Sequence, residues 1–419
     1  MKRWPAAVIV LVLLCALLGA QANEAVTPSE RVTESVPIRE EASGDAVEIG
    51  RLRKGQQAAL LLSVPRWYRI RLANGTEGFV SKSWTTRVPQ TTPLGPTPAI
   101  QDIPFKVHFL DVGTGDSAII DIGDREIVID GGNSSTILKK YVTDRQIIDG
   151  PIELVVVTHG DTDHWKGLQR LMNFDNRAPN PPKVLEFWDP GYDRDCNGSN
   201  HSGRAGYLNF INQFRALQGV RFLRPLQNTH PPADQTGQVQ PFTLPSIPGV
   251  TFTVLHSAVA PTSDNSECSY LINNASIVLK LQIGASTFLF TGDANGKERN
   301  DTSAANIGHV ERALVQLNQK FPGTLKVDVL KAPHHGSETA SSSPFIAATD
   351  PRFAIFSAST GHHIPKETVL HRYEAPGRVI LRTDDHHESN VDHIICIKDV
   401  GEALDCNYEA VWVEGGVIQ

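Results

Sequence analysis

Residues 154–167 read LVVVTHGDTDHWKG, and this stretch decides the fold. Four consecutive apolar residues at 154–157 predict an interior strand of a parallel or mixed sheet, because a strand covered on both faces has no polar alternation. The polar run that follows therefore lies at the carboxyl end of a strand. It carries two histidines and two aspartates within six positions: His159, Asp161, Asp163 and His164.

These four side chains alternate along what we expect to be a tight turn, so several of them can converge on one point. Imidazole and carboxylate groups together suit zinc, manganese or iron. An alternative is that Asp161, Thr162 or Asp163 only caps a helix that begins near Trp165. Capping requires one such residue rather than four, so the run predicts a metal site in which a capping role can coexist.

The sequence around this run alternates predicted strands and helices. We expect strands at 106–111, 117–122, 126–130, 154–158, 184–188, 250–256, 276–283, 286–291 and 326–331. Helices are expected at 165–174, 205–217 and 309–320. Strand pairs interspersed with helices predict α/β packing in layers, a pair of sheets covered by helices.

The first 22 residues predict a cleaved export signal. A basic start, MKRW, precedes a 14-residue apolar stretch, and Ala20-Gln21-Ala22 is a small-x-small cleavage site before Asn23. The alternative is a membrane anchor, but this stretch falls short of the roughly 20 residues that span a bilayer. We therefore expect a secreted or periplasmic protein without a transmembrane domain.

Export bears on whether the cysteines form disulfides. Four remain after Cys15 is removed with the signal, and an even number in an oxidising compartment favours disulfides. Cys396 and Cys406 flank a hairpin-like stretch, which predicts one pair and leaves Cys196 with Cys268 as the other. A thiolate zinc site is not expected, because the sequence has no C-x-x-C motif.

Residues 25–87 form a separate predicted domain of short strands, followed by a Pro/Thr-rich linker at 88–102. Asn74-Gly75 predicts a hairpin turn. The Trp-Tyr pair and the terminal GFVSKSW resemble the bacterial SH3-like domain, an all-β barrel, and this resemblance implies a cell-wall or protein ligand. The alternative is a folded spacer whose small core is formed by Trp67, Tyr68 and Phe79.

The charge argues against a strong nonspecific attraction to nucleic acid. The formal net charge is −7, and loss of Lys2 and Arg3 with the signal takes it to −9. A polyanionic substrate must therefore be held locally, for example by basic residues at 166–170 and 204–224.

The polar run resembles the H-x-H-x-D-H signature of the metallo-β-lactamase fold, with Asp161 where the second histidine usually stands. Four further motifs accompany it: FLDVGTGD at 109–116, IDGG at 129–132, FTGD at 290–293 and LKAPHHGSETASSS at 330–343. Together they resemble the metallo-β-lactamase-like domain of the ComEC family of DNA-uptake proteins, over residues 105–385. The resemblance implies an αββα sandwich within residues 103–419; the membrane portion of that family is missing.

The resemblance also implies two divalent metal ions, zinc or manganese. By the family pattern, His159 and Asp161 hold one ion, Asp163 and His164 hold the other, and Asp293 joins or bridges them. A late histidine is His362 or His363, and we favour His362. Three further residues are candidates for ligation or support: His256 as an imidazole, Asp116 as a partner of a metal-binding histidine, and Ser337 as a donor to an anionic oxygen.

His334 and His335 follow an apolar run in the same way as the first motif. Two adjacent side chains on a continuing strand point to opposite faces. We therefore expect one histidine to face the metals and the other to face either the residues behind the metal ligands or the substrate, and a histidine of this pair to protonate the leaving oxygen. Asp163, His334 and His335 are the predicted catalytic residues.

This ligand set predicts an exported metal-dependent hydrolase in which a metal-activated water attacks the substrate. A phosphodiesterase or nuclease, with DNA as a candidate substrate, is the favoured function. The alternatives are a hydrolase of small esters, lactams or cell-wall phosphoesters, and a noncatalytic wall-associated protein that metals only stabilise. The segment DDHHESNVDH at 384–393 has histidines and acidic residues that could bind another metal ion. We expect it to be a solvated loop instead, because it is charged and rich in turn-forming residues.

Overall fold

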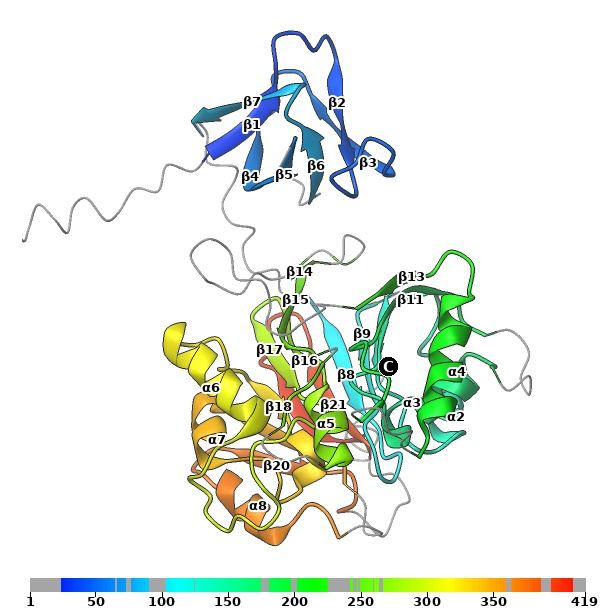
Figure 1. Cartoon of the computed structure of the whole chain (residues 1–419), viewed down its shortest axis with the longest axis vertical. Helices are drawn as coiled ribbons and strands as arrows, with labels where there is room; N and C mark the ends of the chain where they lie inside the picture. The colour runs from blue at the N-terminus through cyan, green and yellow to red at the C-terminus, as the bar shows by residue number, and fades with distance from the viewer. Residues whose placement is uncertain are drawn as a thin grey trace, which may run out of the picture. The chain divides into compact units, whose positions relative to one another are not determined.

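The computed structural model divides the chain into two compact units, residues 1–100 and 101–419 (Figure 1). The structure describes residues 24–64, 66–72, 77–89, 103–123, 125–174, 181–196, 202–224, 242–243, 247, 249–258, 260–263, 267–358, 363–385 and 393–409. The predicted signal and most of the predicted linker lie outside these ranges. Among the described residues, no helix is long and apolar enough to cross a membrane.

The N-terminal unit is an all-β domain with one sheet in the order β3-β2-β6-β5-β4-β1-β7. Its strands are β1 (Glu24–Pro28), β2 (Ser35–Arg39), β3 (Glu48–Arg53), β4 (Ala58–Val64), β5 (Trp67–Arg71), β6 (Glu77–Ser81) and β7 (Thr85–Pro89). β5 and β6 pair in antiparallel fashion, which confirms the predicted hairpin; Asn74 and Gly75 themselves lie outside the described residues.

The core of this unit is aliphatic rather than aromatic. Its buried members include Val36, Ile38, Leu52, Ile70 and Val80. Tyr68 only packs against the edge of that cluster, and Trp67 and Phe79 are half-buried. The alternative in which Trp67, Tyr68 and Phe79 form the core is therefore wrong: alternation along β2 and β6 turns the aliphatic positions inward.

The larger unit contains two facing sheets. The first has the order β13-β12-β11-β10-β9-β8-β21-β22. Its strands are β8 (Phe105–Phe109), β9 (Ala118–Asp121), β10 (Glu126–Ile129), β11 (Ile152–Val156), β12 (Val184–Trp188), β13 (Arg221–Leu223), β21 (Ile394–Lys398) and β22 (Asp405–Tyr408). β10, β11, β12 and β13 run parallel, and β11 is buried along its whole length, as its apolar run predicts.

The second sheet has the order β14-β15-β16-β17-β18-β19-β20. Its strands are β14 (Phe242–Thr243), β15 (Val250–His256), β16 (Val278–Ile283), β17 (Ser286–Phe290), β18 (Val329–Lys331), β19 (Phe353–Phe356) and β20 (Val379–Arg382). β17 to β20 are parallel neighbours. Both sheets therefore present carboxyl ends of parallel strands, where loops can gather functional side chains.

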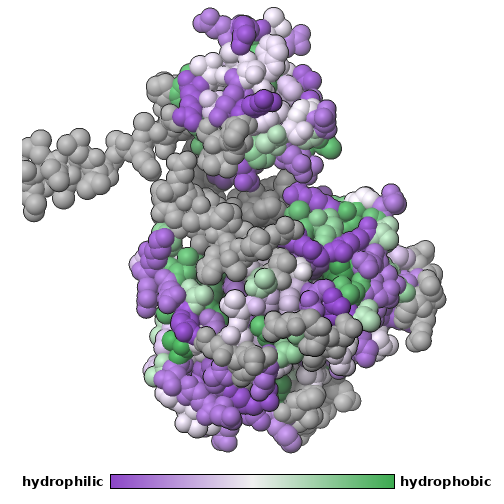
Figure 2. Space-filling model, viewed as in Figure 1, coloured by the Kyte–Doolittle hydropathy of each residue, from purple (hydrophilic) through white to green (hydrophobic). Residues whose placement is uncertain are grey.

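Helices cover the outer face of each sheet (Figure 1). The first sheet carries α2 (Ile137–Asp144), α3 (Thr162–Leu171) and α4 (Arg204–Arg215); the second carries α6 (His309–Lys320), α7 (Ser343–Thr349) and α8 (Glu367–Tyr373). One apolar cluster fills the space between the sheets, and one lies under each helical layer. This arrangement is the predicted αββα sandwich. Hydrophilic side chains predominate over α8 on the face in Figure 2, as expected for a helix that buries one side.

The sequence located the long elements but not the short helices. β12, β15 and α6 lie where they were expected. α5 (Cys268–Asn274), α7 and α8 have seven residues each, too few to show a helical period. α3 begins at Thr162, three residues earlier than expected, so Asp163 and His164 belong to its first turn rather than to a preceding loop.

Both predicted disulfides are present. Cys396 and Cys406 lie opposite one another on β21 and β22. Cys268, the first residue of α5, is joined to Cys196 across 72 positions of sequence. The prediction of the two pairs from the cysteine count is therefore confirmed.

Two glycines fix the position of α3 on the first sheet. A Cβ at Gly167 would lie 1.9 Å from the carbonyl oxygen of Gly131, and one at Gly131 would lie 2.6 Å from the amide nitrogen of Leu168. The amide of Gly131 also donates to the carbonyl of His164 at 2.6 Å. The IDGG motif thus seats the helix that carries Asp163 and His164.

We expect Gly167→Ala to lower the free energy of unfolding by about 1–3 kcal/mol, because the new methyl group overpacks a backbone contact that cannot yield. Gly206→Ala is the matched helical control, since its Cβ would meet Trp165 at an ordinary 3.6 Å. It should be neutral or stabilising by about 0.5–1 kcal/mol. Urea unfolding of the two variants measures the difference, and equal effects would contradict this account.

Candidate metal centre

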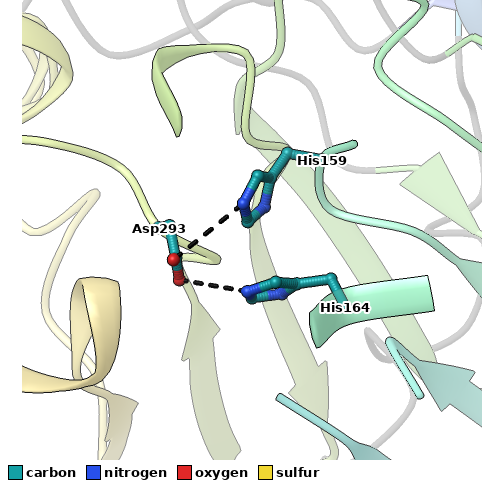
Figure 3. Close-up of side chains that lie close together, drawn as sticks. All are labelled: His159, His164 and Asp293. Atoms are coloured by element: carbon teal, nitrogen blue, oxygen red, sulfur yellow. Dashed lines mark ion pairs between the residues drawn. The ribbon is translucent and has the colours of Figure 1, made fainter. Parts of the chain in front are cut away.

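The candidate site lies where loops from both sheets meet. His159 follows β11, and Asp163 and His164 lie in the first turn of α3. From the second sheet, Asp293 follows β17, and His334 and His335 follow β18. Figure 3 shows His159 and His164 pointing toward Asp293 from the opposite sheet.

Asp293 is the centre of this arrangement, because each of its carboxylate oxygens faces two imidazoles. Oδ1 lies 3.3 Å from Nε2 of His164 and 3.3 Å from Nε2 of His335. Oδ2 lies 3.9 Å from Nε2 of His159 and 3.8 Å from Nε2 of His334. Two further aspartates lie next to these imidazoles. Asp161 Oδ2 is 3.6 Å from Nε2 of His159, and Asp163 Oδ2 is 3.7 Å from Nε2 of His335.

The chemistry of these donors fits divalent metal ions. The Nε2 atoms of His159, His164 and His335 and Oδ1 of Asp293 are buried without a hydrogen-bond partner. Such groups are costly to leave unsatisfied, by about 1–3 kcal/mol each. Four triads of donor atoms, each within 4.8 Å of one another, occur here, and His164 belongs to three of them. Divalent cations among these donors would supply the partners that the buried atoms lack.

An unusual backbone conformation aims the neighbouring histidines. His334 and His335 have φ values of 49° and 53°, in the left-handed region, and Gly336 follows at 83°. Non-glycine residues in this region cost of order 1 kcal/mol or more, and such strain is characteristic of functional sites. The strand does not continue through the pair, so the expectation that one ring faces away is wrong: both Nε2 atoms face Asp293.

Asp161 occupies the N-cap position of α3 but makes no capping hydrogen bond with its side chain. Its Oδ2 faces His159 instead, and its Oδ1 accepts a 2.5 Å bond from Arg194. The capping alternative therefore does not describe this carboxylate. Burial would raise the pKa of Asp161, yet the contact with His159 and the charge of Arg194 lower it to about 2.

Buried carboxylates orient the histidines from behind. Asp130 Oδ2 lies 2.9 Å from Nδ1 of His164 and also accepts from the hydroxyl of Thr158. Asp116 Oδ1 lies 3.1 Å from Nδ1 of His335, and its other oxygen pairs with Lys331. A carboxylate behind a histidine fixes the ring and leaves Nε2 for a metal. This is the supporting role predicted for Asp116.

The two neighbouring histidines of the metal-free protein differ in protonation. Burial alone would lower the pKa of His335, but the carboxylates of Asp293 and Asp116 outweigh it and raise that pKa to about 9. Burial lowers the pKa of His334 to about 4, and Asp293 offsets only part of this effect. At neutral pH His335 therefore carries a proton that a metal ion must displace, whereas His334 is already neutral.

Some predicted residues are not part of the cluster. His256 Nε2 lies 2.8 Å from the carbonyl oxygen of Asn274 and is absent from the donor triads. Ser337 contacts Thr339 at 3.2 Å, and Thr339 in turn contacts Nδ1 of His334. His363 is exposed. His362 and residues 386–392 of the late His/Asp segment lie outside the described residues.

Four residues of the site were not predicted individually. Asp130 and Lys331 stand inside the motifs IDGG and LKAPHHGS, so the motifs were found but not the roles. Arg194 and Asn273 lie outside every motif; Nδ2 of Asn273 is 3.4 Å from Nε2 of His334. Nothing in the sequence singles out these two, because only the folded chain brings them to Asp161 and His334.

The chain belongs to the metallo-β-lactamase superfamily, whose family model matches residues 110–362. The superfamily and the donor cluster together define the larger unit as a metal-dependent hydrolase with a site for divalent metal. Residues 34–86 match the bacterial SH3 domain model, which confirms that assignment of the N-terminal unit.

The chain is similar to Competence protein ComA of Neisseria gonorrhoeae, with 26% identity over 336 residues, 78% of this chain and 36% of that protein. It is 32% identical over 114 residues to ComE operon protein 3 of Bacillus subtilis (strain 168), 27% of this chain and 13% of that protein. The chain thus spans about a third or less of the length of these relatives. The short form of human tRNase Z aligns with a TM-score of 0.36 at 14% identity, over 61% of this chain and 94% of that chain.

We expect the metal affinity of the protein to rise with pH from neutral pH toward and beyond the His335 pKa of about 9, and to level off only when His164, whose pKa is also raised well above its usual value, has lost its proton too. The sign follows from the raised pKa: below 9 a proton competes for the imidazole, and this competition weakens as the pH rises. Competition titrations with a chromophoric chelator at each pH measure the profile.

Asp116→Asn provides the control, because loss of its charge lowers the pKa of His335 and should shift the plateau to lower pH. An affinity that does not depend on pH over this interval would contradict the assignment of His335.

Proposed function

We propose that the protein is an exported phosphodiesterase or nuclease that uses two divalent metal ions, zinc or manganese. One observation carries the proposal: a single buried carboxylate, Asp293, faces two imidazoles with each of its oxygens. A carboxylate so placed is suited to join two neighbouring cations.

We assign the donors to two sets that share Asp293, next to which His159 and His164 of the two sets also lie close together. His159, Asp161 and His334 would hold one ion, and Asp163, His164 and His335 would hold the other. When bound, such ions lower the pKa of a coordinated water and stabilise negative charge on phosphorus-bound oxygens. Both histidines of the PHHG motif then act as ligands, which replaces the role of a leaving-group acid predicted for one of them.

The chain's own residues prepare this chemistry. Asp130 and Asp116 hold the rings of His164 and His335, so little reorganisation is needed when an ion enters. Lys331 places a buried positive charge beside Asp116, and its ammonium also lies 3.9 Å from Asp293. That charge offsets part of the repulsion between the carboxylates of Asp116 and Asp293, and it keeps Asp116 ionised behind its histidine.

Two considerations support a phosphodiester substrate, with DNA as the first candidate. The carboxylates at Asp161 and Asp163 make the site richer in oxygen than an all-histidine site, which favours hard ions and phosphoryl chemistry. In addition, the sequence motifs resemble the ComEC family of DNA-uptake proteins, and the chain is similar to Competence protein ComA. The acidic net charge argues against tight nonspecific binding to DNA.

We expect the purified mature protein to cleave single- or double-stranded DNA only with added manganese or zinc. Asp163→Ala should reduce this activity by about two to three orders of magnitude, because it removes a carboxylate from one donor set. Bis-p-nitrophenyl phosphate, tested beside DNA, serves as a generic diester. Asp144→Ala, at an exposed position of α2, is the control and should retain full activity.

The other outcomes separate the remaining functions. Cleavage of the generic diester but not of DNA would direct the search to cell-wall or small phosphoesters. Failure to cleave either substrate by protein that holds its metal ions would contradict the proposal and favour a noncatalytic, metal-stabilised protein.

Export and attachment to the cell wall form the second part of the proposal. The basic start, short apolar stretch and Ala20-Gln21-Ala22 site support export, and the bacterial SH3 domain supports a wall or protein ligand. Expressed with residues 1–22, the protein should be recovered outside the cytoplasm with Asn23 at its N-terminus, which measurement of the intact mass checks.

The protein should also co-sediment with purified cell walls, whereas a variant without residues 25–87 should not. An uncleaved or cytoplasmic product would contradict export, and equal sedimentation would contradict the wall ligand.

A further inference from the structure

We propose that the disulfide Cys196–Cys268 supports one half-site of the metal centre, the set of His159, Asp161 and His334. It joins the two elements whose side chains position Asp161 and His334. These elements are the loop after β12, which carries Arg194, and helix α5, which carries Asn273. The inference rests on the proposed two-metal function and assigns a structural cause to the occupancy of one of its sites.

Arg194 holds Asp161, the carboxylate that stands where the family signature has a histidine. Its guanidinium donates to Asp161 Oδ1 at 2.5 Å and to the carbonyl oxygen of Gly160 at 2.5 Å, and also to Ser202 at 2.8 Å. Only 5% of the Arg194 side chain is exposed. One oxygen of Asp161 is thus committed to the arginine, and the other is directed toward His159.

A histidine binds an ion through one ring nitrogen at a time, whereas an aspartate can rotate and can offer either or both oxygens. Fixing one oxygen with a planar, fully charged donor removes this freedom. Gly160 permits the approach, since a Cβ there would lie only 3.0 Å from Cγ of Arg194. The arginine therefore compensates for the substitution of aspartate for histidine.

Asn273 stands on the other side of the same half-site. Its Nδ2 lies 3.4 Å from Nε2 of His334, and its Oδ1 is buried without a hydrogen-bond partner. The side chain is 4% exposed, so it cannot turn to solvent. This buried amide therefore lies against the ring of His334 and restricts the positions that the ring can adopt.

The disulfide joins these two supports covalently. Cys196 lies two residues after Arg194, and Cys268 begins the helix that carries Asn273. Apart from the bridge, the elements share a small apolar cluster of Tyr192, Cys196, Leu271, Ile272 and Ala275, separate from the three large clusters of the sandwich. Arg194 and Cys196 both have positive φ values, 65° and 46°. Because this strained loop shares only a small apolar cluster with α5, its position relative to α5 depends on the covalent link.

The second half-site has no such dependence. His164 and His335 are held by Asp130 and Asp116, which belong to the sheet framework next to β10 and β9. Loss of the disulfide should therefore weaken one ion selectively rather than both.

The test compares Cys196→Ser/Cys268→Ser with Cys396→Ser/Cys406→Ser, a matched double variant that removes the other disulfide. Bound manganese or zinc is counted by mass spectrometry of the metal after gel filtration, and each affinity is measured by competition with a chelator. We expect the first variant to bind one of its two ions at least about tenfold more weakly and the control to bind both as the wild type does. Thermal unfolding of the metal-free proteins separates this effect from a loss of fold.

Arg194→Lys tests the same idea with the disulfide intact. Lysine keeps the charge but has a single nitrogen in place of the planar pair that joins Asp161 and Gly160 to Ser202, so it holds Asp161 less rigidly and we expect the same selective weakening of one ion. Wild-type protein that holds a single ion would overturn both this inference and the two-metal proposal. Two ions of unchanged affinity in Cys196→Ser/Cys268→Ser and Arg194→Lys would overturn this inference alone.

Discussion

The candidate site of the larger unit depends on the electrostatics of a few buried donors where loops from its two sheets meet. His159, His164 and His335 are removed from water and turn unpaired nitrogen atoms toward Asp293, whose Oδ1 is also unpaired. Burying such groups opposes folding unless something compensates them. The carboxylates of Asp130, Asp116 and Asp293 supply part of the compensation through the histidine rings, and the remaining valences are those that a divalent ion would fill.

The αββα architecture makes this gathering of charge feasible. Each sheet contributes loops at the carboxyl ends of buried strands, so the donors lie on short connections between rigid elements. The apolar cluster between the sheets holds the two halves together without placing polar groups in its interior. Backbone contacts of glycine then set the fine positions. Gly115, for example, has a φ of 113°, and a Cβ there would lie 1.9 Å from the carbonyl oxygen of Asp163.

Several departures from ordinary local structure lie at this centre. The left-handed pair His334 and His335, the positive φ of Asp130 and the positive φ of Arg194 are all tolerated in residues that orient or provide donors. Each is unfavourable by itself, and each persists because the surrounding packing and hydrogen bonds determine it. The replacement of a histidine by Asp161 follows the same pattern, because a buried arginine from a distant loop accompanies it.

The sequence by itself determined the fold class, the larger elements and most members of the donor cluster. Apolar runs end in polar motifs at 157–164, 290–293 and 330–336, and a buried strand must place such residues at the edge of a sheet. Cysteine number and the hairpin pattern likewise identified both disulfides. Only the tertiary structure decided that both His334 and His335 face Asp293, that His256 and His363 stand apart from the cluster, and that Arg194 and Asn273 belong to it. The physical reason is the distance along the chain over which each feature is determined. Periodicity and turn-forming residues determine local conformation. The direction of a side chain after a strained turn and the approach of a distant loop depend on the packing of the whole unit.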